Sequence, residues 1–305
     1  MVIERTHLHS YRPAAVLTVV GEDALAFLQG QFTNELRKEA GNVVYGLWLN
    51  QKGRVLADSQ VLGLSVKNFI LVSVSSPAPS INQRLVEYIV ADDATLMDET
   101  ENYHGLALWG NNCGERVKDL LGAVPRRGQF LAKDEWLVFT GRRVSGESFE
   151  IIGSGEKITA LRETLLRLNC MEVGANEVEV ARLVSGIPAI PQDIGPDDLP
   201  NEGGLEDAAI SYTKGCYLGQ EVMARLKNMG QVRRHLRVVQ GAVAAPKTGT
   251  PLYQIGKKAG EIRSAAATAD GYIAMAMLTR LGFNASAGYG FSAEGPVMAE
   301  IYSNG

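Results

Sequence analysis

The sequence has no long hydrophobic run, few cysteines and no excess of positive charge. None of its 305 residues lies in an apolar stretch of the ~18 residues that a membrane-spanning helix needs, which argues against an integral membrane protein. Residues 1–11 carry charges and histidines instead of the apolar segment of a secretory signal. Three cysteines (Cys113, Cys170 and Cys216) are too few for a disulfide framework. We therefore expect a cytoplasmic protein with no membrane partner.

Several binding motifs are also missing. The net charge of -4, from 30 basic and 34 acidic residues, argues against direct binding of nucleic acid. No glycine-rich G-x-G-x-x-G sequence follows a predicted strand and no Walker sequence is present, so the usual nucleotide cradles are not expected. The cysteines and the four histidines are dispersed, and they predict no metal site.

What is present predicts an α+β fold. Apolar and β-branched runs predict strands over residues 15–20, 43–49, 55–64, 69–74, 136–139 and 149–152. Helical spacing predicts helices over residues 23–30, 80–89 and 156–168. The sequence Asn50-Gln51-Lys52-Gly53 predicts a hairpin turn between the second and third strands.

The last seventy residues have a different pattern. Short strand-like runs separated by glycine and proline predict a small antiparallel β-barrel, with strands at 236–239, 251–255, 259–265, 274–278 and 295–302. We place a domain boundary before it. Residues 1–232 then form one region of two interleaved α+β subdomains, and residues 233–305 form the barrel.

Residues 186–209 form a proline- and glycine-rich loop of a length that is uncommon in a compact domain unless it has a function. The loop has six acidic residues and no basic ones, whereas residues 225–237 have five basic residues and no acidic ones. Two interpretations stay open. The two segments pair with each other, which is the common outcome, or together they bind a ligand that has both hydrogen-bond donors and an anionic tail.

Residues 214–221, Lys-Gly-Cys-Tyr-Leu-Gly-Gln-Glu, are the most informative segment. The pattern predicts a strand over 210–213 and a short helix over 220–226, so that Cys216 lies in the turn entering a helix. The helix N-terminus and the Lys214 ammonium would both lower the pKa of the Cys216 thiol. The alternative is that Cys216 is a small buried side chain, the commoner role of a lone cysteine.

The same segment, with Val222-Met223-Ala224-Arg225 after it, resembles the signature of the YgfZ-type folate-binding proteins, relatives of the glycine-cleavage T-protein that include iron–sulfur assembly factors. Residues 19–30 with 33–35, and residues 50–55, 182–188 and 199–202, also resemble segments of this superfamily. The resemblance implies a T-protein-like three-part fold, with a ferredoxin-like middle part and a C-terminal β-barrel, around a central tetrahydrofolate.

Roles for individual residues follow from the resemblance. Pro200-Asn201-Glu202 is similar to the segment whose glutamate holds the pterin ring in the T-protein relatives, and one carboxylate can accept two parallel N–H bonds from a pyrimidine edge. Without the resemblance, Glu202 is better explained as a solvated loop acid. Arg233, Arg234 or Arg237 is expected to meet the anionic tail of the folate. Arg225, within the signature, is a further candidate for ligand binding.

One departure bears on the activity. The aminomethyltransferase relatives carry paired acids after the hairpin glycine, and this chain has Ala57 and Asp58 there. Asp58 alone is then the candidate ligand-binding acid, or it ends a strand in solvent. Together with the Lys-Gly-Cys signature, which the aminomethyltransferases lack, the single acid shifts the expectation away from glycine cleavage.

The sequence supports three hypotheses. The first is a tetrahydrofolate-binding auxiliary protein that supports assembly or repair of iron–sulfur clusters, with an indirect effect on tRNA modification. In it Cys216 reacts with a one-carbon unit or a cluster intermediate, Lys214 tunes the thiol, and Glu202 holds the pterin; its partners are iron–sulfur assembly or client proteins. The second is a folate-dependent one-carbon transferase or demethylase that depends on Asp58. The third is a docking scaffold without chemistry, so the residues leave open whether the protein is an enzyme.

Overall fold

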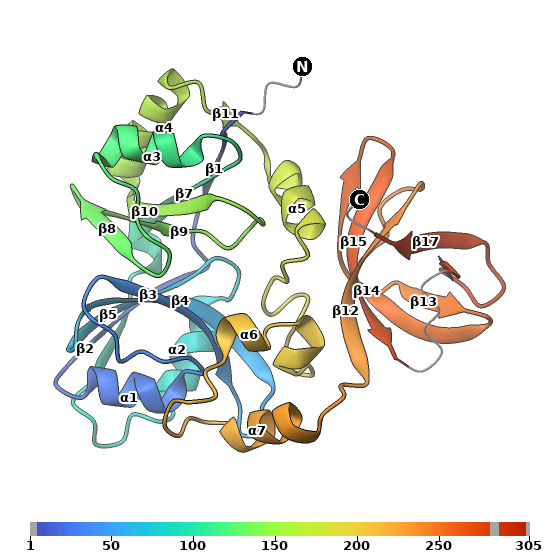
Figure 1. Ribbon diagram of the computed structural model, residues 1–305, viewed down its shortest axis with the longest axis horizontal. Coiled ribbons are helices and arrows are strands. Elements are labelled where there is room, and N and C mark those ends of the chain that lie inside the picture. The colour runs from blue at the N-terminus through green and yellow to red at the C-terminus, as the bar shows by residue number, and fades with distance from the viewer. Residues whose placement is uncertain (1–4, 281–286, 303–305) are drawn as a thin grey trace.

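The computed structural model describes residues 5–280 and 287–302, which form three units around one centre (Figure 1). Two sheets with their helices lie on one side, and a closed β-barrel lies on the other. The two sheets are interleaved in sequence, because the first strand of the chain and strands β7–β11 form one sheet while β2–β6 form the other.

The sheet of β2–β6 has the strand order β3-β4-β5-β2-β6, and its pairs are antiparallel. Its strands are β2 (Ala15–Val20), β3 (Asn42–Leu49), β4 (Val55–Ser65), β5 (Asn68–Ser73) and β6 (Thr95–Asp98). Helices α1 (Ala24–Gln31) and α2 (Ala78–Val86) bury Leu28, Ile81 and Leu85 against its Trp48 and Val61. Because successive strand residues face opposite sides, the neighbours of these core residues face away from the helices.

The second sheet has the order β11-β1-β7-β10-β9-β8. Its strands are β1 (His7–Tyr11), β7 (Tyr103–Trp109), β8 (Phe130–Lys133), β9 (Trp136–Thr140), β10 (Ser148–Ser154) and β11 (Met171–Glu172), and a 3-10 helix, η1 (Thr100–Asn102), precedes β7. Helices α3 (Cys113–Leu121) and α4 (Gly155–Arg167) pack on it, and Cys113 and Cys170 are both buried in that core.

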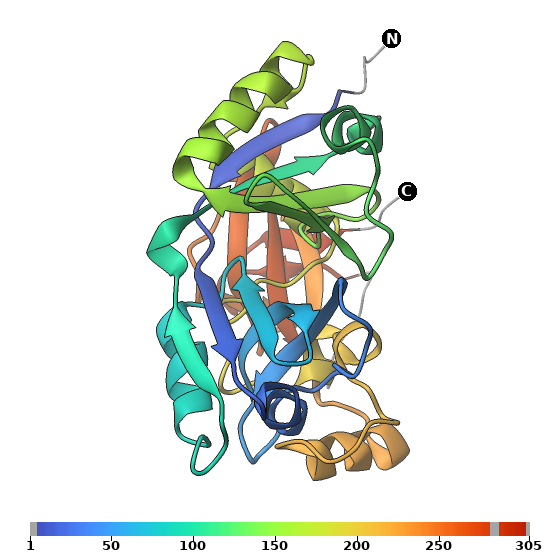
Figure 2. The ribbon, with the colours of Figure 1, turned by 90° about the vertical axis from the view of Figure 1, so that its left-hand side faces the viewer.

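The two sheets meet through a separate apolar cluster. Val16, Leu62 and Val72 of the first sheet pack with Phe139 and Ile152 of the second. Figure 2 shows the two sheet units stacked one above the other, with the barrel behind both. This contact fixes the loop after β9 relative to strand β4, which positions the site described below.

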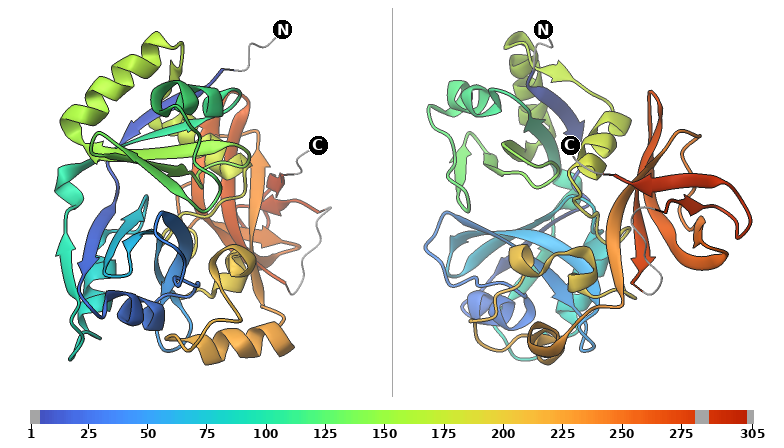
Figure 3. Two further views of the ribbon diagram at one scale, coloured as in Figure 1. Left: turned by 60° about the vertical axis from the view of Figure 1, so that its left-hand side comes forward. Right: turned by 45° about the vertical axis from the view of Figure 1, so that its right-hand side comes forward.

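The chain between the second sheet and the barrel contains four short helices: α5 (Ala175–Val184), the 3-10 helix η2 (Pro200–Gly203), α6 (Glu206–Ala209) and α7 (Gln220–Met229). Helix α5 lies between the sheets and the barrel, whereas α7 lies at the end of the first sheet unit (Figure 1, Figure 3). The strand predicted over residues 210–213 is wrong. Within the described residues no strand pairs with this segment, and its Ser211 makes a single backbone hydrogen bond, 3.0 Å from N to the Thr33 carbonyl. An apolar, β-branched run becomes a strand only where a neighbouring strand receives it.

The barrel closes in the order β12-β15-β14-β13-β16-β17. Its strands are β12 (Arg234–Gly241), β13 (Pro251–Gln254), β14 (Lys257–Thr268), β15 (Gly271–Thr279), β16 (Tyr289–Gly290) and β17 (Val297–Ile301). A buried ionic cluster joins it to the rest. Asp193 accepts hydrogen bonds from Arg182 of α5 at 2.7 Å and from Ser264 of β14 at 2.6 Å.

The predicted fold class is confirmed, including the C-terminal barrel. Each of the other strands and helices predicted from the sequence overlaps an element of the predicted type, with ends that differ by a few residues. The acidic loop contains two single-turn helices, which its prolines and glycines did not predict. In the part of the chain that the structure describes, no helix is long and apolar enough to cross a membrane.

Candidate functional site

A polar cavity opens beside Asp58, between the first sheet, the loop after β9 and the start of the proline-rich loop. Its volume is about 60 Å³. Asp58 pairs with Leu47 across the β3–β4 hairpin, and Tyr45 pairs with Gln60. These four residues therefore share the sheet face that is turned away from α1 and α2. The cavity is lined by Tyr45, Asp58, Gln60, residues 72–75, Arg142, Arg143, Arg182 and residues 187–190.

The alternation along β4 also explains the departure at Ala57. Ala57 is fully buried in the core under the helices, whereas Asp58, the next residue, lines the cavity. Only one of two consecutive strand residues can face one side of a sheet. Alanine at position 57 therefore does not remove an acid from the cavity, and it carries less weight against a transferase than the sequence indicated.

The Asp58 carboxylate is held by hydroxyl groups on three sides. Its Oδ1 accepts hydrogen bonds from Ser76 at 2.6 Å and Ser73 at 3.0 Å, and its Oδ2 accepts one from Tyr45 at 3.2 Å. Burial raises the pKa of Asp58, and the three hydroxyl donors and Arg142 offset part of this shift. Since Oδ2 has one protein donor, it keeps capacity for a donor from a ligand in the cavity.

Arg142 covers the other side of Tyr45. Its guanidinium carbon lies 3.8 Å from the centre of the Tyr45 ring, within the range of a cation–π contact. Burial raises the pKa of Tyr45 well above its ordinary value, and the Asp58 charge raises it further. Tyr45 therefore stays a hydroxyl donor to Asp58 at neutral pH.

A larger cavity of about 540 Å³ adjoins the first and shares four lining residues with it: Tyr45, Gln60, Arg142 and Ile187. We call the cavity at Asp58 the inner cavity and the larger one the outer cavity. The outer cavity extends past the loop after β9 toward Arg127 and Gly128. A volume of several hundred Å³ is typical of small-molecule sites.

Arg143 also lines the inner cavity, but its charge is already paired. Its Nε donates to Glu150 Oε1 at 2.7 Å, and its guanidinium carbon lies 3.7 Å from the centre of the Tyr11 ring. Desolvation lowers the pKa of Arg143, but the interactions with buried Glu150 and with Tyr11 together outweigh it, so that the pKa is raised. Arg143 thus fixes the wall of the cavity. Arg142 stacks on Tyr45 and has no ion pair among the described residues, so it is the arginine better placed to meet a ligand.

Lys214 is buried and holds the signature segment against α1. Its Nζ donates hydrogen bonds to the backbone carbonyls of Gln29 at 2.8 Å, Phe32 at 2.6 Å and Asn34 at 2.9 Å. Carbonyls at a helix C-terminus lack intrahelical donors and attract a cation. Burial lowers the pKa of Lys214 to about 8. Its ammonium is directed at these three carbonyls. An effect of Lys214 on the pKa of the Cys216 thiol therefore stays a prediction.

Cys216 is exposed, two residues after a buried lysine. The residues that line the inner and outer cavities do not include it. Gly219, three residues after Cys216, allows close packing. Its φ is +85°, and a side chain there would approach the Asn50 carbonyl oxygen to 2.9 Å. The start of α7 is thereby placed against the β3–β4 turn, and Cys216 is left at the surface.

Glu202 is buried, and the structure pairs it with Arg234. Its Oε1 lies 2.9 Å from Arg234 Nε, and its Oε2 lies 2.9 Å from Arg234 Nη2. Oε2 also accepts the Leu199 backbone N–H at 2.8 Å. Asp198, which is fully enclosed, contacts Arg234 at 3.0 Å and Arg263 at 3.2 Å. Of the two interpretations of the acidic loop and the basic segment, mutual pairing is the one realised at these residues.

Arg225 and Arg233 are exposed, and neither lines the inner or the outer cavity. The cavity instead brings together residues that the sequence did not single out: Tyr45, Gln60, Arg127 and Arg142. Strand alternation places Tyr45 and Gln60 beside Asp58, which could have been anticipated from the hairpin. No local sequence pattern identifies Arg127 or Arg142 as cavity residues, because it is the contact between the two sheets that places them at the cavity.

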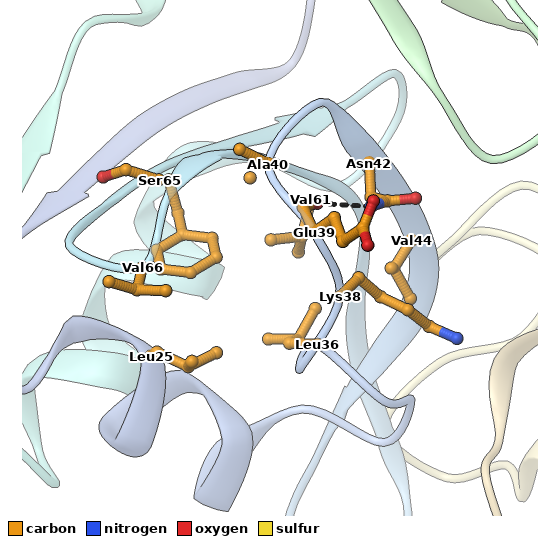
Figure 4. Close-up of a pocket in the computed structure, with 12 residues that line it drawn as sticks. Leu25, Leu36, Lys38, Glu39, Ala40, Asn42, Val44, Val61, Ser65 and Val66 are labelled. Carbon is orange, nitrogen blue, oxygen red and sulfur yellow. Dashed lines mark hydrogen bonds between the residues drawn. The ribbon is translucent and has the colours of Figure 1, made fainter.

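Two other features carry no site. A hollow beside α1 has a volume of about 10 Å³, and apolar side chains including Leu25, Leu36, Val61 and Val66 surround it (Figure 4). A space of that size holds about one water molecule. Within residues 5–280 and 287–302, no group of three or more His, Cys, Asp or Glu side chains is placed to hold a metal ion.

A three-part α+β fold with a closed barrel and a polar central cavity defines the class of T-protein-like proteins. The crystal structure of the glycine cleavage system aminomethyltransferase T from Bartonella henselae superposes with a TM-score of 0.84 at 20% identity, over 98% of this chain and 86% of that one. The chain belongs to the GCVT N-terminal domain family, which matches residues 2–214.

Curated relatives include aminomethyltransferases and members of the branch that the signature indicated. The aminomethyltransferase of Lysinibacillus sphaericus is 24% identical over 81% of this chain and 70% of its own length. The tRNA-modifying protein YgfZ of Colwellia psychrerythraea is 25% identical over 80% of this chain and 74% of its own length. The human mitochondrial iron–sulfur cluster assembly factor IBA57 is 28% identical over 82% of this chain and 72% of its own length. The resemblance to the YgfZ-type family is confirmed.

Proposed function

We propose that the protein binds tetrahydrofolate in the cavity at Asp58 and supports the assembly or repair of iron–sulfur clusters in other proteins. Support for the second part comes from the relatives, one of which is named as an iron–sulfur cluster assembly factor. Support for the first part comes from the cavity and its membership of a T-protein-like fold. An effect on tRNA modification follows only indirectly, through client enzymes that carry clusters.

The single observation that carries the binding proposal is the Asp58 carboxylate at the inner cavity. A reduced pterin presents an amino group and ring N–H donors along one edge, and a carboxylate oxygen with free capacity accepts such donors. Ser73, Ser76 and Tyr45 fix the carboxylate, so the Asp58 side chain loses little conformational freedom when a ligand binds. The remainder of the folate extends into the outer cavity. When bound, the folate would supply a nitrogen that carries a one-carbon unit.

Glu202 is the second candidate for binding the pterin ring. Both of its oxygens accept hydrogen bonds from Arg234, and Glu202 is not among the residues that line the inner or the outer cavity. Asp58 lines the inner cavity. We therefore assign the pterin edge to Asp58 and a structural role to the Glu202–Arg234 pair.

Cys216 is proposed to act on a macromolecular partner. The thiol is exposed and lies outside the residues that line the cavities, while Lys214 anchors its segment to the end of α1. A surface thiol on an anchored loop can reach a cluster intermediate or a client protein. Within the described residues Cys216 belongs to no group of three or more His, Cys, Asp or Glu side chains placed to hold a metal ion, so we assign most of the cluster's ligands to that partner.

Binding is tested by anaerobic calorimetry with tetrahydrofolate. The wild type is expected to bind, and Asp58→Asn is expected to weaken the affinity about 10- to 100-fold, the range for loss of a hydrogen bond to a charged group. Asp119→Asn, at an exposed acid on α3, serves as the matched control and should bind like the wild type. Equal affinity of the Asp58→Asn variant and the wild type would contradict the assignment.

The cellular role is tested in cells that lack the protein, with the activity of a cluster-dependent enzyme as the readout. The proposed function expects Asp58→Asn and Cys216→Ser each to fail to restore that activity at normal protein levels. If Cys216→Ala and Asp58→Asn both restore it fully, the result supports a docking scaffold that uses neither group.

A one-carbon transferase or demethylase is the second candidate, and the position of Asp58 in the cavity favours it. It predicts turnover of a methylated amine with tetrahydrofolate, lost in Asp58→Asn and retained in Cys216→Ser. No turnover of such amines by a protein that binds tetrahydrofolate would reject it.

A further inference from the structure

The β-barrel has a cleft of its own, at the place where strands β12 and β17 separate. Its volume is about 470 Å³, and residues 240–243, Thr268, Asp270, Tyr272 and residues 297–300 line it. It shares no lining residue with the inner or the outer cavity. Strand β17 lies on the side of the barrel that faces away from the two sheets (Figure 1). We call this feature the barrel cleft, and it is a surface separate from the centre of the molecule.

The barrel cleft opens because the ladder between β12 and β17 stops early. The two strands pair at two positions, of which the last along β12 is Gln240 with Glu300. Continued in the same register, the ladder would place residues 241–243 opposite residues 297–299. Among the described residues no backbone hydrogen bond joins these two segments. On their other sides β12 stays paired with β15 and β17 with β16, so the barrel keeps its shape while this seam is open.

Ala242 has open backbone groups at this seam. Hydrogen-bonded pairs in an antiparallel ladder fall on alternate residues, and Tyr302 N donates to the Val238 carbonyl at 2.9 Å. Counted from that bond, the N–H and the carbonyl of Ala242 belong to the side of β12 that faces β17. The Met298 carbonyl, opposite Ala242 in this register, accepts the Tyr272 hydroxyl at 2.9 Å instead. In the described part of the chain neither backbone group of Ala242 has a hydrogen-bond partner, so both are available to a ligand in the barrel cleft.

The barrel cleft is acidic and has apolar side chains on both sides of the seam. Asp270 and Glu300 line it, and no Lys, Arg or His does. Both acids are exposed, and neither has a basic group within ion-pair distance among the described residues. Val243 and Val297 are 37% and 58% exposed. An acidic wall attracts cations, and exposed apolar side chains are stabilised when a partner covers them.

We propose that the barrel cleft binds an extended segment of a partner protein, one that carries lysine or arginine between apolar residues. The segment pairs its backbone with Ala242, places its basic side chains at Asp270 and Glu300, and covers the two valines. Addition of an extended peptide to an open strand edge is a recurring mode of recognition, in which the backbone gives affinity and the side chains give specificity. The inference goes beyond the proposed function, because the barrel cleft is separate from both cavities and requires no folate.

The test measures fluorescence anisotropy with a short labelled peptide in which lysine and valine alternate. The wild type is expected to bind this peptide in the micromolar range and not to bind the same peptide with glutamate in place of lysine. Methylation of the valine backbone nitrogens should weaken binding about tenfold, because it removes the donors for strand pairing. Hydrogen exchange of residues 241–243 should slow when the lysine peptide is added. No binding of that peptide would overturn the proposal, as would equal binding of the glutamate peptide or of the methylated one.

Substitutions in the barrel then locate the binding. Asp270→Asn and Glu300→Gln should each weaken it about 2- to 5-fold, the range for an exposed ion pair. Glu294→Gln is the matched control, since Glu294 is an exposed acid of the barrel that does not line the cleft. It should bind like the wild type, and thermal melting checks that all three variants are folded. Equal effects of Glu294→Gln and Glu300→Gln would overturn the proposal. A wild type that dimerises through this seam and excludes the peptide would overturn it in favour of an interface between two copies.

Discussion

Arg234 donates a hydrogen bond to each carboxylate oxygen of Glu202, at 2.9 Å in both cases. The pair joins the first strand of the barrel to the acidic loop, and Arg234 contacts Asp198 of the same loop. Bidentate pairs of this kind are stronger than single ion pairs and fix the relative orientation of the two segments. The two segments of opposite charge thus hold the barrel against the rest of the chain.

Glu202→Gln is expected to lower the free energy of unfolding by about 1–3 kcal/mol, because a buried charged hydrogen-bond pair is lost. Chemical denaturation measures this change. Asp207→Asn, at an exposed acid in the same segment, should change stability by less than about 0.5 kcal/mol. The affinity for tetrahydrofolate should stay within about twofold of the wild type. A fall in affinity at unchanged stability would instead identify Glu202 as the pterin ligand.

Lys214→Met is expected to lower the free energy of unfolding by about 2–4 kcal/mol. The change removes the common donor of three backbone carbonyls at the end of α1, and unpaired buried carbonyls are costly. Hydrogen exchange should become faster in the last turn of α1 and in residues 214–219. Lys157→Met, at an exposed lysine of α4, is the control. An unchanged stability of Lys214→Met would show that these carbonyls find other donors.

The three thiols are expected to react at different rates with an aromatic disulfide reagent. Cys216 is exposed and should react first. Burial and the nearby Glu147 raise the pKa of the Cys113 thiol to about 12, and burial raises the pKa of Cys170, so both should react slowly in the folded protein. One fast thiol per chain is expected, three in denaturant, and none in folded Cys216→Ser. Persistence of the fast phase in that variant would refute the assignment.

Asp58 is expected to make stability depend on pH in a window that begins at its ordinary pKa of 3.8. Its pKa is raised in the folded state, so between 3.8 and the folded pKa the folded protein binds more protons than the unfolded chain. The stabilising contribution is therefore complete below the window and is lost as the pH rises through it. Denaturation of the wild type and Asp58→Asn across this range measures the effect: the free energy of unfolding of the wild type, relative to that of the variant, should fall as the pH rises. A rise in this relative stability with pH would contradict the prediction.

The sequence predicted the ordinary elements well, because their signals are local. Apolar and β-branched runs predicted β2 to β5, helical spacing predicted α4, and the barrel followed from short strands between turn residues. The strand predicted before Cys216 was wrong for a physical reason. Residues 210–213 have the composition of a strand, but strand formation depends on a neighbour that the sequence does not reveal.

The candidate site was predicted only in part. Asp58 was named as a candidate because the hairpin that carries it resembles a known family, and the strand register places it on the sheet face turned away from the helices. Glu202 and Lys214 were identified as residues of interest, and both are buried and fully hydrogen-bonded. A carboxylate or an ammonium has the same sequence signature whether it meets a ligand, an arginine or the end of a helix.

By itself the sequence determined the fold class, the family and the residues able to ionise. The tertiary structure decided which of those residues have a partner. Arg142 and Arg127 line the cavity because apolar residues of two separate sheets meet, and Arg234 is paired because the barrel packs against the acidic loop. Charge and composition are local properties, whereas the availability of a charge depends on neighbours brought from distant parts of the chain.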